Sequence, residues 1–150
     1  MDRDELLAEG DVNLASTLRL YARTAVGAAM EDDGGVFLVS TSATWPGPYH
    51  NGAIRLDHSI APEEVASRAE AFFKERCPGF CIWIADHADS DLEKFALGAG
   101  YASASAAGAP RMALERRLEL GVPPPGVTLE EVRDEAARLD YLAVTVEAYR

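Results

Sequence analysis

Two short, unbroken apolar runs constrain the fold of this chain more than any other feature. Residues 36–39 read Val-Phe-Leu-Val, and residues 80–84 read Phe-Cys-Ile-Trp-Ile, the most apolar stretch of the sequence. A strand that is apolar at every position is buried on both sides, as central strands are when helices cover a sheet. Glycine or proline precedes each run, at Gly34-Gly35 and at Pro78-Gly79, and interrupts the chain there. The sequence therefore predicts an α/β domain built around these two strands.

Helical patterns and weaker strand patterns surround the two runs. Apolar residues at helical spacing predict helices over 12–29 and 62–76, and the second has Pro62 in its first turn, where proline is tolerated. Ser90 and Glu93 have capping-box spacing and predict a short helix from 90 to about 98. Three further strands are predicted, over 53–56, 101–105 and 112–118. The last two would pair as an antiparallel hairpin.

Length and charge limit the classes of function. At 150 residues the chain suits one ordinary domain, and none of its apolar runs approaches the roughly 18 residues of a membrane-spanning helix. The N-terminus is acidic, unlike that of a signal peptide, so we expect a cytoplasmic protein without a membrane partner. The formal net charge of −11 repels phosphate backbones, so we expect no nucleic-acid partner.

The two cysteines leave three interpretations open. Cys77 and Cys81 flank a Pro-Gly-Phe turn, and they could be buried thiols, a reversible disulfide or half of a zinc site. Zinc in structural sites takes four ligands, but His50, His58 and His87 have no metal-ligand spacing to the cysteines or to each other. We therefore expect buried thiols and no metal site.

The predicted order of elements, helix, strand, strand, helix, strand, helix, strand, strand, resembles that of the GNAT superfamily of acetyl-coenzyme A-dependent N-acetyltransferases. Two local matches support the resemblance, which covers residues 12–118. Residues 95–101 read Phe-Ala-Leu-Gly-Ala-Gly-Tyr, a short helix ending in Gly-aromatic, and residues 112–114 read Met-Ala-Leu, similar to a closing strand of the family. The resemblance implies a central, mixed, mostly antiparallel sheet flanked by helices on both faces. It also implies acetyl-coenzyme A as the cofactor of the family and an amine as acceptor.

The chain past the first lobe resembles the beginning of a second one. Residues 121–126 read Gly-Val-Pro-Pro-Pro-Gly, a linker by composition. A strand predicted over 127–132, followed by a helix capped by Asp134, is similar to the opening of another GNAT domain. We interpret 1–120 as a GNAT-like lobe and 127–150 as the beginning of an incomplete second lobe. The expected partner is the rest of that second lobe, or another copy of the chain.

Residues 55–64 depart from the family pattern. Active members carry a loop similar to Gln/Arg-x-x-Gly-x-Gly/Ala there, whose backbone N–H groups hold the pyrophosphate of the coenzyme. This chain has no glycine in the segment, and it places Asp57, Pro62, Glu63 and Glu64 there. Proline has no N–H to donate, and the carboxylates repel phosphate. We therefore expect that this lobe binds no acetyl-coenzyme A, and no catalytic residue is assigned.

A loop rich in aromatic and polar residues is the first candidate ligand site. Residues 45–52 include proline and glycine and carry two aromatic rings, an imidazole and an amide that could grip a small molecule such as an amine. The candidate residues are Trp45, Tyr49, His50 and Asn51. The alternative is that these rings pack back on their own domain.

The second candidate site follows the strand predicted over 80–84. Trp83 and Asp86 lie at its carboxyl end, where open α/β sheets place ligands, and Asp86 with His87 could accept protons from an amine. The alternative gives Asp86 and Asp89 turn hydrogen bonds and places Trp83 in the core. Tyr101 could act as a general acid or could pack against the core.

Three functions follow from these observations. The first is a non-catalytic N-terminal lobe of a tandem GNAT-type acetyltransferase, whose acyl transfer takes place in the second lobe. The second is a homodimeric or small-ligand-binding module that uses the aromatic loop. The third is a free-standing acetyltransferase with an atypical coenzyme site.

Overall fold

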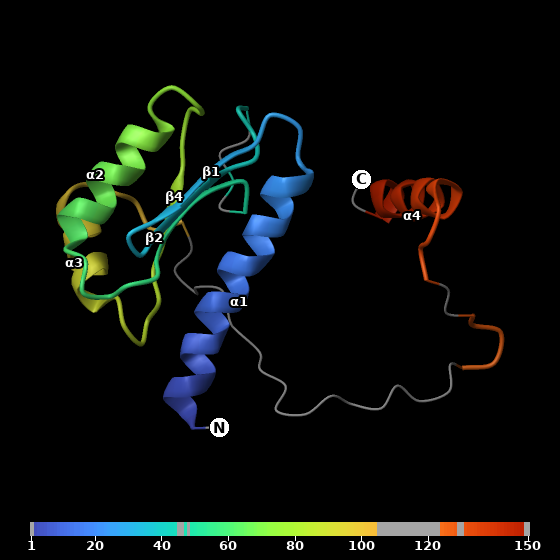
Figure 1. The fold of residues 1–150 in the computed structure, drawn as a ribbon, viewed down its shortest axis with the longest axis horizontal. Coiled ribbons are helices and arrows are strands. Elements are labelled where there is room, and N and C mark those ends of the chain that lie inside the picture. The colour runs from blue at the N-terminus through green and yellow to red at the C-terminus, as the bar shows by residue number, and fades with distance from the viewer. Residues whose placement is uncertain (1, 45–46, 48, 105–123, 129–130, 149–150) are drawn as a thin grey trace. The chain divides into compact units, whose positions relative to one another are not determined.

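The computed structural model describes residues 2–44, 47, 49–104, 124–128 and 131–148. The chain divides into two compact units, Met1–Glu115 and Arg116–Arg150. The described part of the first unit is an α+β domain with a four-stranded mixed sheet (Figure 1). None of the described helices has the length and apolar character needed to cross a bilayer.

The sheet has the strand order β1-β2-β3-β4. Its members are β1 (Ala29–Asp33), β2 (Val36–Ser40), β3 (Asn51–Arg55) and β4 (Cys81–Trp83). The pairs β1–β2 and β2–β3 are antiparallel, and β3–β4 is parallel. Parallel neighbours need a crossover connection, which is supplied here by α2 (Pro62–Phe73). The helix predicted from Pro62 is thus confirmed. As a crossover between parallel strands, it brings the carboxyl ends of β3 and β4 to the same end of the sheet.

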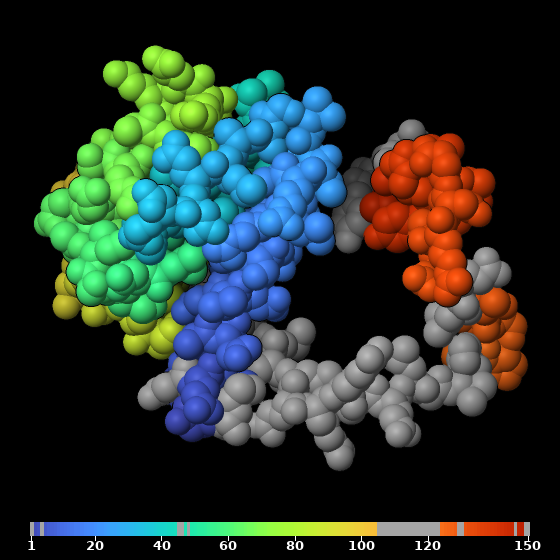
Figure 2. Space-filling model, in the orientation of Figure 1, coloured from blue at the N-terminus to red at the C-terminus, as the bar shows by residue number. Residues whose placement is uncertain are grey.

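Strand β2 is the centre of the core, as its apolar run predicts, and all five of its residues are buried. Because side chains alternate along a strand, Val36 and Leu38 pack with α2 and with α3 (Ser90–Gly98), whereas Phe37 and Val39 pack with α1 (Arg3–Thr24). In Figure 2 the blue atoms of α1 lie directly against the lighter blue segment that follows it. Both sides of β2 therefore exclude water.

Strand β4 is less buried than its composition predicts. It spans three residues, all half-buried, and among the described strands it pairs only with β3, so it lies at an edge of the described sheet. The prediction of a fully buried central strand over 80–84 is therefore wrong in length and in burial. The apolar run reports contact with the core, which Phe80, Ile82 and Ile84 make from partly buried positions.

Helix α1 and strand β1 differ from the predicted helix over 12–29. Asp2 and Glu5 form a capping box that starts the helix at Arg3: the Asp2 carboxylate accepts from Glu5 N at 2.9 Å, and the Glu5 carboxylate accepts from Asp2 N at 3.0 Å. The helix ends at Thr24, ahead of Gly27 with its φ of 76°. Strand β1, which follows, was not predicted because four of its five residues are exposed, so it has no apolar alternation.

The strand predicted over 101–105 is not formed in the residues of that range that the structure describes. Residues 101–104 are not in a strand, and 105–123, which include the other predicted strand over 112–118, lie outside the described residues. In the second unit, the described residues 127–128 and 131–132 are not in a strand either. The predicted helix that follows is confirmed as α4 (Glu135–Ala148), and the Asp134 carboxylate accepts from Ala137 N at 2.8 Å.

Candidate functional site

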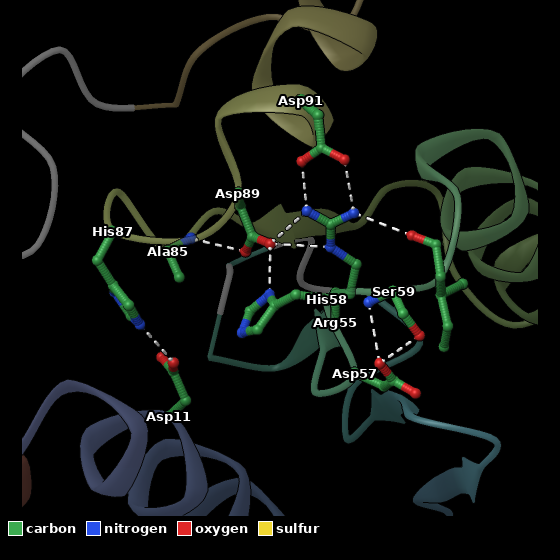
Figure 3. A network of polar contacts seen from close by, with 10 residues as sticks. Asp11, Arg55, Asp57, His58, Ser59, Ala85, His87, Asp89 and Asp91 are labelled. Carbon is green, nitrogen blue, oxygen red and sulfur yellow. Dashed lines mark hydrogen bonds and ion pairs between the residues drawn. The ribbon is translucent and has the colours of Figure 1, made fainter. Parts of the chain in front are cut away.

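A network of polar side chains lies where β3 and β4 end (Figure 3). The parallel register pairs Ile54 with Trp83, so the loops that follow these two strands leave the sheet side by side. Open sheets typically bind ligands just beyond the carboxyl ends of their parallel strands. The network is therefore the candidate site that the fold itself indicates.

Arg55, the last residue of β3, is at the centre of the network and only 1% exposed. Its Nε donates to Asp89 Oδ1 at 2.8 Å, and its Nη1 donates to the Ile60 carbonyl at 2.9 Å and to Asp91 Oδ2 at 3.0 Å. Its Nη2 is 2.5 Å from Asp91 Oδ1 and 2.7 Å from Asp89 Oδ1. The guanidinium thus donates four hydrogen bonds, and Nη2 makes a further ion-pair contact with Asp89. Hydrogen bonding to Asp91 raises the pKa of Arg55, and the same contact lowers the pKa of Asp91 to about 2.

Asp89 joins the two loops from the other side. It is 1% exposed, and besides Arg55 it accepts from His58 Nδ1 at 2.9 Å and from Ala85 N at 2.9 Å. Because this side chain turns toward Arg55, it makes no cap hydrogen bond to α3, although Asp89 is the N-cap residue. The capping box predicted from Ser90 is therefore wrong, since Ser90 lies inside the helix.

The loop between β3 and α2 is held by its own acidic residue. Asp57 Oδ1 accepts from Ser59 N at 2.9 Å and from Ser59 Oγ at 2.7 Å, and these bonds lower the pKa of Asp57. Helix α2 then begins at Pro62 without a side-chain cap and with Glu63 and Glu64 in its first turn. Active members of the family that the sequence resembles carry a phosphate-binding loop at this position. In this chain the segment carries carboxylates instead.

The aromatic loop has a mixed outcome. Trp45 lies outside the described residues. Tyr49 contacts Trp83, with ring centroids 5.3 Å apart, so the structure brings these two predicted residues together. Asn51 is buried: its side chain accepts from Ser40 Oγ at 2.9 Å and donates to the Ser42 carbonyl at 2.9 Å.

The contacts that the structure gives for His50 and Asp86 do not involve the Tyr49–Trp83 ring pair. His50 Nδ1 is 3.2 Å from Thr41 Oγ1, and His50 lines an open hollow of about 310 Å³ with residues from the end of α1. Asp86 is exposed in the loop after β4. The predicted ligand contacts of all these residues stay predictions.

Tyr101 packs against the domain, and the two cysteines are less buried than predicted. The Tyr101 ring lies 6.1 Å from that of Phe80, and its hydroxyl donates to Glu70 Oε1 at 2.8 Å. Burial, aided by Glu70, raises the pKa of Tyr101 to about 12, which does not suit a general acid near neutral pH. Cys77 and Cys81 are half-buried free thiols, and burial raises the pKa of Cys81.

Sequence reasoning missed the residues that form the network. Arg55, Asp89 and Asp91 were predicted only as parts of a strand end, a turn and a helix start. One available signal was the arginine in an otherwise apolar strand segment, because a buried guanidinium needs carboxylate partners. Among the described residues, one group could also hold a metal ion: Asp11, His58 and His87, with one ligand atom from each, all within 4.8 Å of one another.

No protein-family model, no curated relative and no solved structure matches this chain.

Proposed function

We propose that this chain provides the non-catalytic lobe of a GNAT-type N-acetyltransferase, in which a second GNAT lobe transfers the acetyl group from acetyl-coenzyme A to an amine. The lobe contributes packing surface and a share of the substrate pocket. Two features support a GNAT-like fold: the mixed sheet, and the α2 connection between two parallel strands. Helices also pack on both sides of β2, in keeping with the layers that the resemblance implies.

The state of Arg55 carries the proposal of a lobe without coenzyme. A guanidinium at the end of β3 would be the natural partner of a phosphate entering at α2. Here each of its N–H groups already faces Asp89, Asp91 or the Ile60 carbonyl. A phosphate would have to displace two carboxylates from a buried cation, which leaves both of them without their counter-charge.

The backbone and the surrounding charge add to this argument. Phosphate at a helix start is held by free N–H groups, and glycine lets the backbone approach it. At α2 the first helical residue is Pro62, which has no N–H, and Glu63 and Glu64 follow it. Asp57, whose pKa is lowered, stays ionised on the preceding loop. Negative charge therefore surrounds the place where the pyrophosphate would bind.

Calorimetric titration of the full chain with acetyl-coenzyme A tests the proposal. We expect no saturable heat at ligand concentrations up to the millimolar range, in a titration where a catalytically active GNAT enzyme serves as the positive control. Micromolar binding would contradict the non-catalytic role and would favour a free-standing acetyltransferase. Sedimentation of the same sample then measures self-association, the alternative way of completing a two-lobed assembly.

A further inference from the structure

Asp11, His58 and His87 meet beside the Arg55 network although they come from three separate parts of the chain. Asp11 lies in α1, His58 in the loop after β3 and His87 in the loop after β4. In Figure 3 the His87 ring points across to Asp11, and the His58 ring lies next to Asp89. We propose that these three side chains bind a divalent transition-metal ion of the zinc class. This proposal is independent of the acetyltransferase role.

The spacing of the ligand atoms fits such an ion. Two ligands that each lie about 2.1 Å from a tetrahedral zinc are roughly 3.4 Å apart. The His87 Nε2 and Asp11 Oδ2 atoms are 3.2 Å apart, which is close to that separation. All three ligand atoms lie within 4.8 Å of one another, so no pair has to close by more than about 1.4 Å to reach the tetrahedral spacing. The imidazoles of His58 and His87 reach solvent and can make that movement by rotating about their side-chain bonds.

Asp89 orients the His58 ring for metal binding. Its carboxylate can only accept, so His58 Nδ1, 2.9 Å from Asp89 Oδ1, is the donor of this hydrogen bond, and Nε2 is the ring nitrogen left for a metal ion. Histidine ligands of metal ions are characteristically held by such a carboxylate. Asp89 is itself fixed by Arg55 and Ala85 N, so it is a positioning residue for the site.

The charges and donor types select the class of ion. Asp11 is 7% exposed, and a divalent cation would neutralise this buried carboxylate. Two imidazoles and one carboxylate suit zinc and its transition-metal neighbours better than magnesium or calcium, which prefer oxygen ligands. Three protein ligands leave a coordination position for water, as in zinc sites that are open to substrate.

The experiment is a calorimetric titration of the full chain with Zn²⁺ after EDTA treatment and gel filtration. We expect one ion per chain. H87A, which changes a solvent-accessible loop residue, should weaken binding at least 100-fold, and D89N should weaken it 10- to 100-fold while all three ligands remain. H50A removes the histidine outside the group and serves as the matched control, with unchanged affinity.

The cysteines are the competing zinc ligands, and a second measurement separates them. Binding should persist in a C77S/C81S variant, and Co²⁺ in the native chain should lack the intense thiolate charge-transfer absorption. Absence of Zn²⁺ binding, binding unchanged by H87A, or binding lost in C77S/C81S each overturns the proposal. If circular dichroism shows that H87A does not fold, the H58Q variant takes its place in the test. The His58 ring is also solvent-accessible, and glutamine keeps a polar side chain at that position.

Discussion

Replacing Asp89 by alanine removes the acceptor of four contacts from the interior of the domain. They come from Arg55 Nε and Nη2, His58 Nδ1 and Ala85 N, at 2.7 to 2.9 Å. Removing one partner of a buried ion pair costs about 3–5 kcal/mol, because the other charge stays buried. Asp91 still faces Arg55 in the variant, so we expect a loss near the lower end, about 3 kcal/mol.

Asp32→Ala is the matched control, since it makes the same chemical change in an exposed pair. Asp32 Oδ2 lies 2.7 Å from Arg19 Nε, but the two side chains are 46% and 24% exposed. Pairs at the surface contribute about 0–1 kcal/mol, because water competes for both charges. Both variants remove a carboxylate that pairs with an arginine Nε at 2.7 to 2.8 Å, but Asp89 is buried and also accepts from His58 and Ala85 N, so its removal should cost more.

The assay is urea unfolding at neutral pH, followed by tryptophan fluorescence and circular dichroism. EDTA in every sample keeps metal binding from adding to the measured free energy of unfolding. Domains of this kind are stable by about 5–15 kcal/mol, so a loss of about 3 kcal/mol shifts the midpoint clearly. If Asp89→Ala costs no more than Asp32→Ala, the reasoning about the buried pair is refuted.

Two further predictions concern the same network and its surroundings. Because the pKa of Asp91 is lowered from 3.8 to about 2, stability present above pH 4 should fall as pH drops toward 2. D91N should lose less stability over that interval. The measurement is the free energy of unfolding in urea at a series of pH values, and the same pH dependence in D91N and the native chain would contradict the prediction. G35A should cost about 2–4 kcal/mol, since Gly35 has a φ of 75° and an added Cβ would lie 2.4 Å from Asp57 Cβ. G27A, with a similar φ of 76° and open space around it, should cost only about 1 kcal/mol in the same thermal or urea unfolding assay, and equal losses would refute the steric part of the argument.

The elements that could be predicted are those whose signal lies within a single segment. The apolar run of β2 reports its burial on both sides, and Pro62 with two following glutamates marks the start of α2. Strand β1 gave no such signal, because an exposed edge strand needs no apolar residues. The same reasoning explains why α1 was misplaced: its start depends on a reciprocal pair of hydrogen bonds between Asp2 and Glu5 rather than on apolar spacing.

The candidate site could not be predicted because it depends on which loops meet. Spacing along the chain tests whether ligands lie on one element, and Asp11, His58 and His87 lie on three. They come together only because β3 and β4 are parallel neighbours and α1 packs on the same sheet. The ion pairs of Arg55 arise in the same way, across two loops. Sequence periodicity contains no information on that pairing.

The turn between β1 and β2 has a consequence for how this domain tolerates change. Hairpin tips usually accept insertions, because their backbone faces solvent. Here the Gly35 carbonyl accepts from Leu56 N at 2.7 Å and from Asp57 N at 3.0 Å, so the tip fixes the first residues of the loop that carries His58. An inserted residue at this tip would shift that loop and the imidazole with it. The turn between β1 and β2 thus holds a loop that lies about twenty residues further along the chain. Its length is constrained by these hydrogen bonds as well as by the hairpin itself.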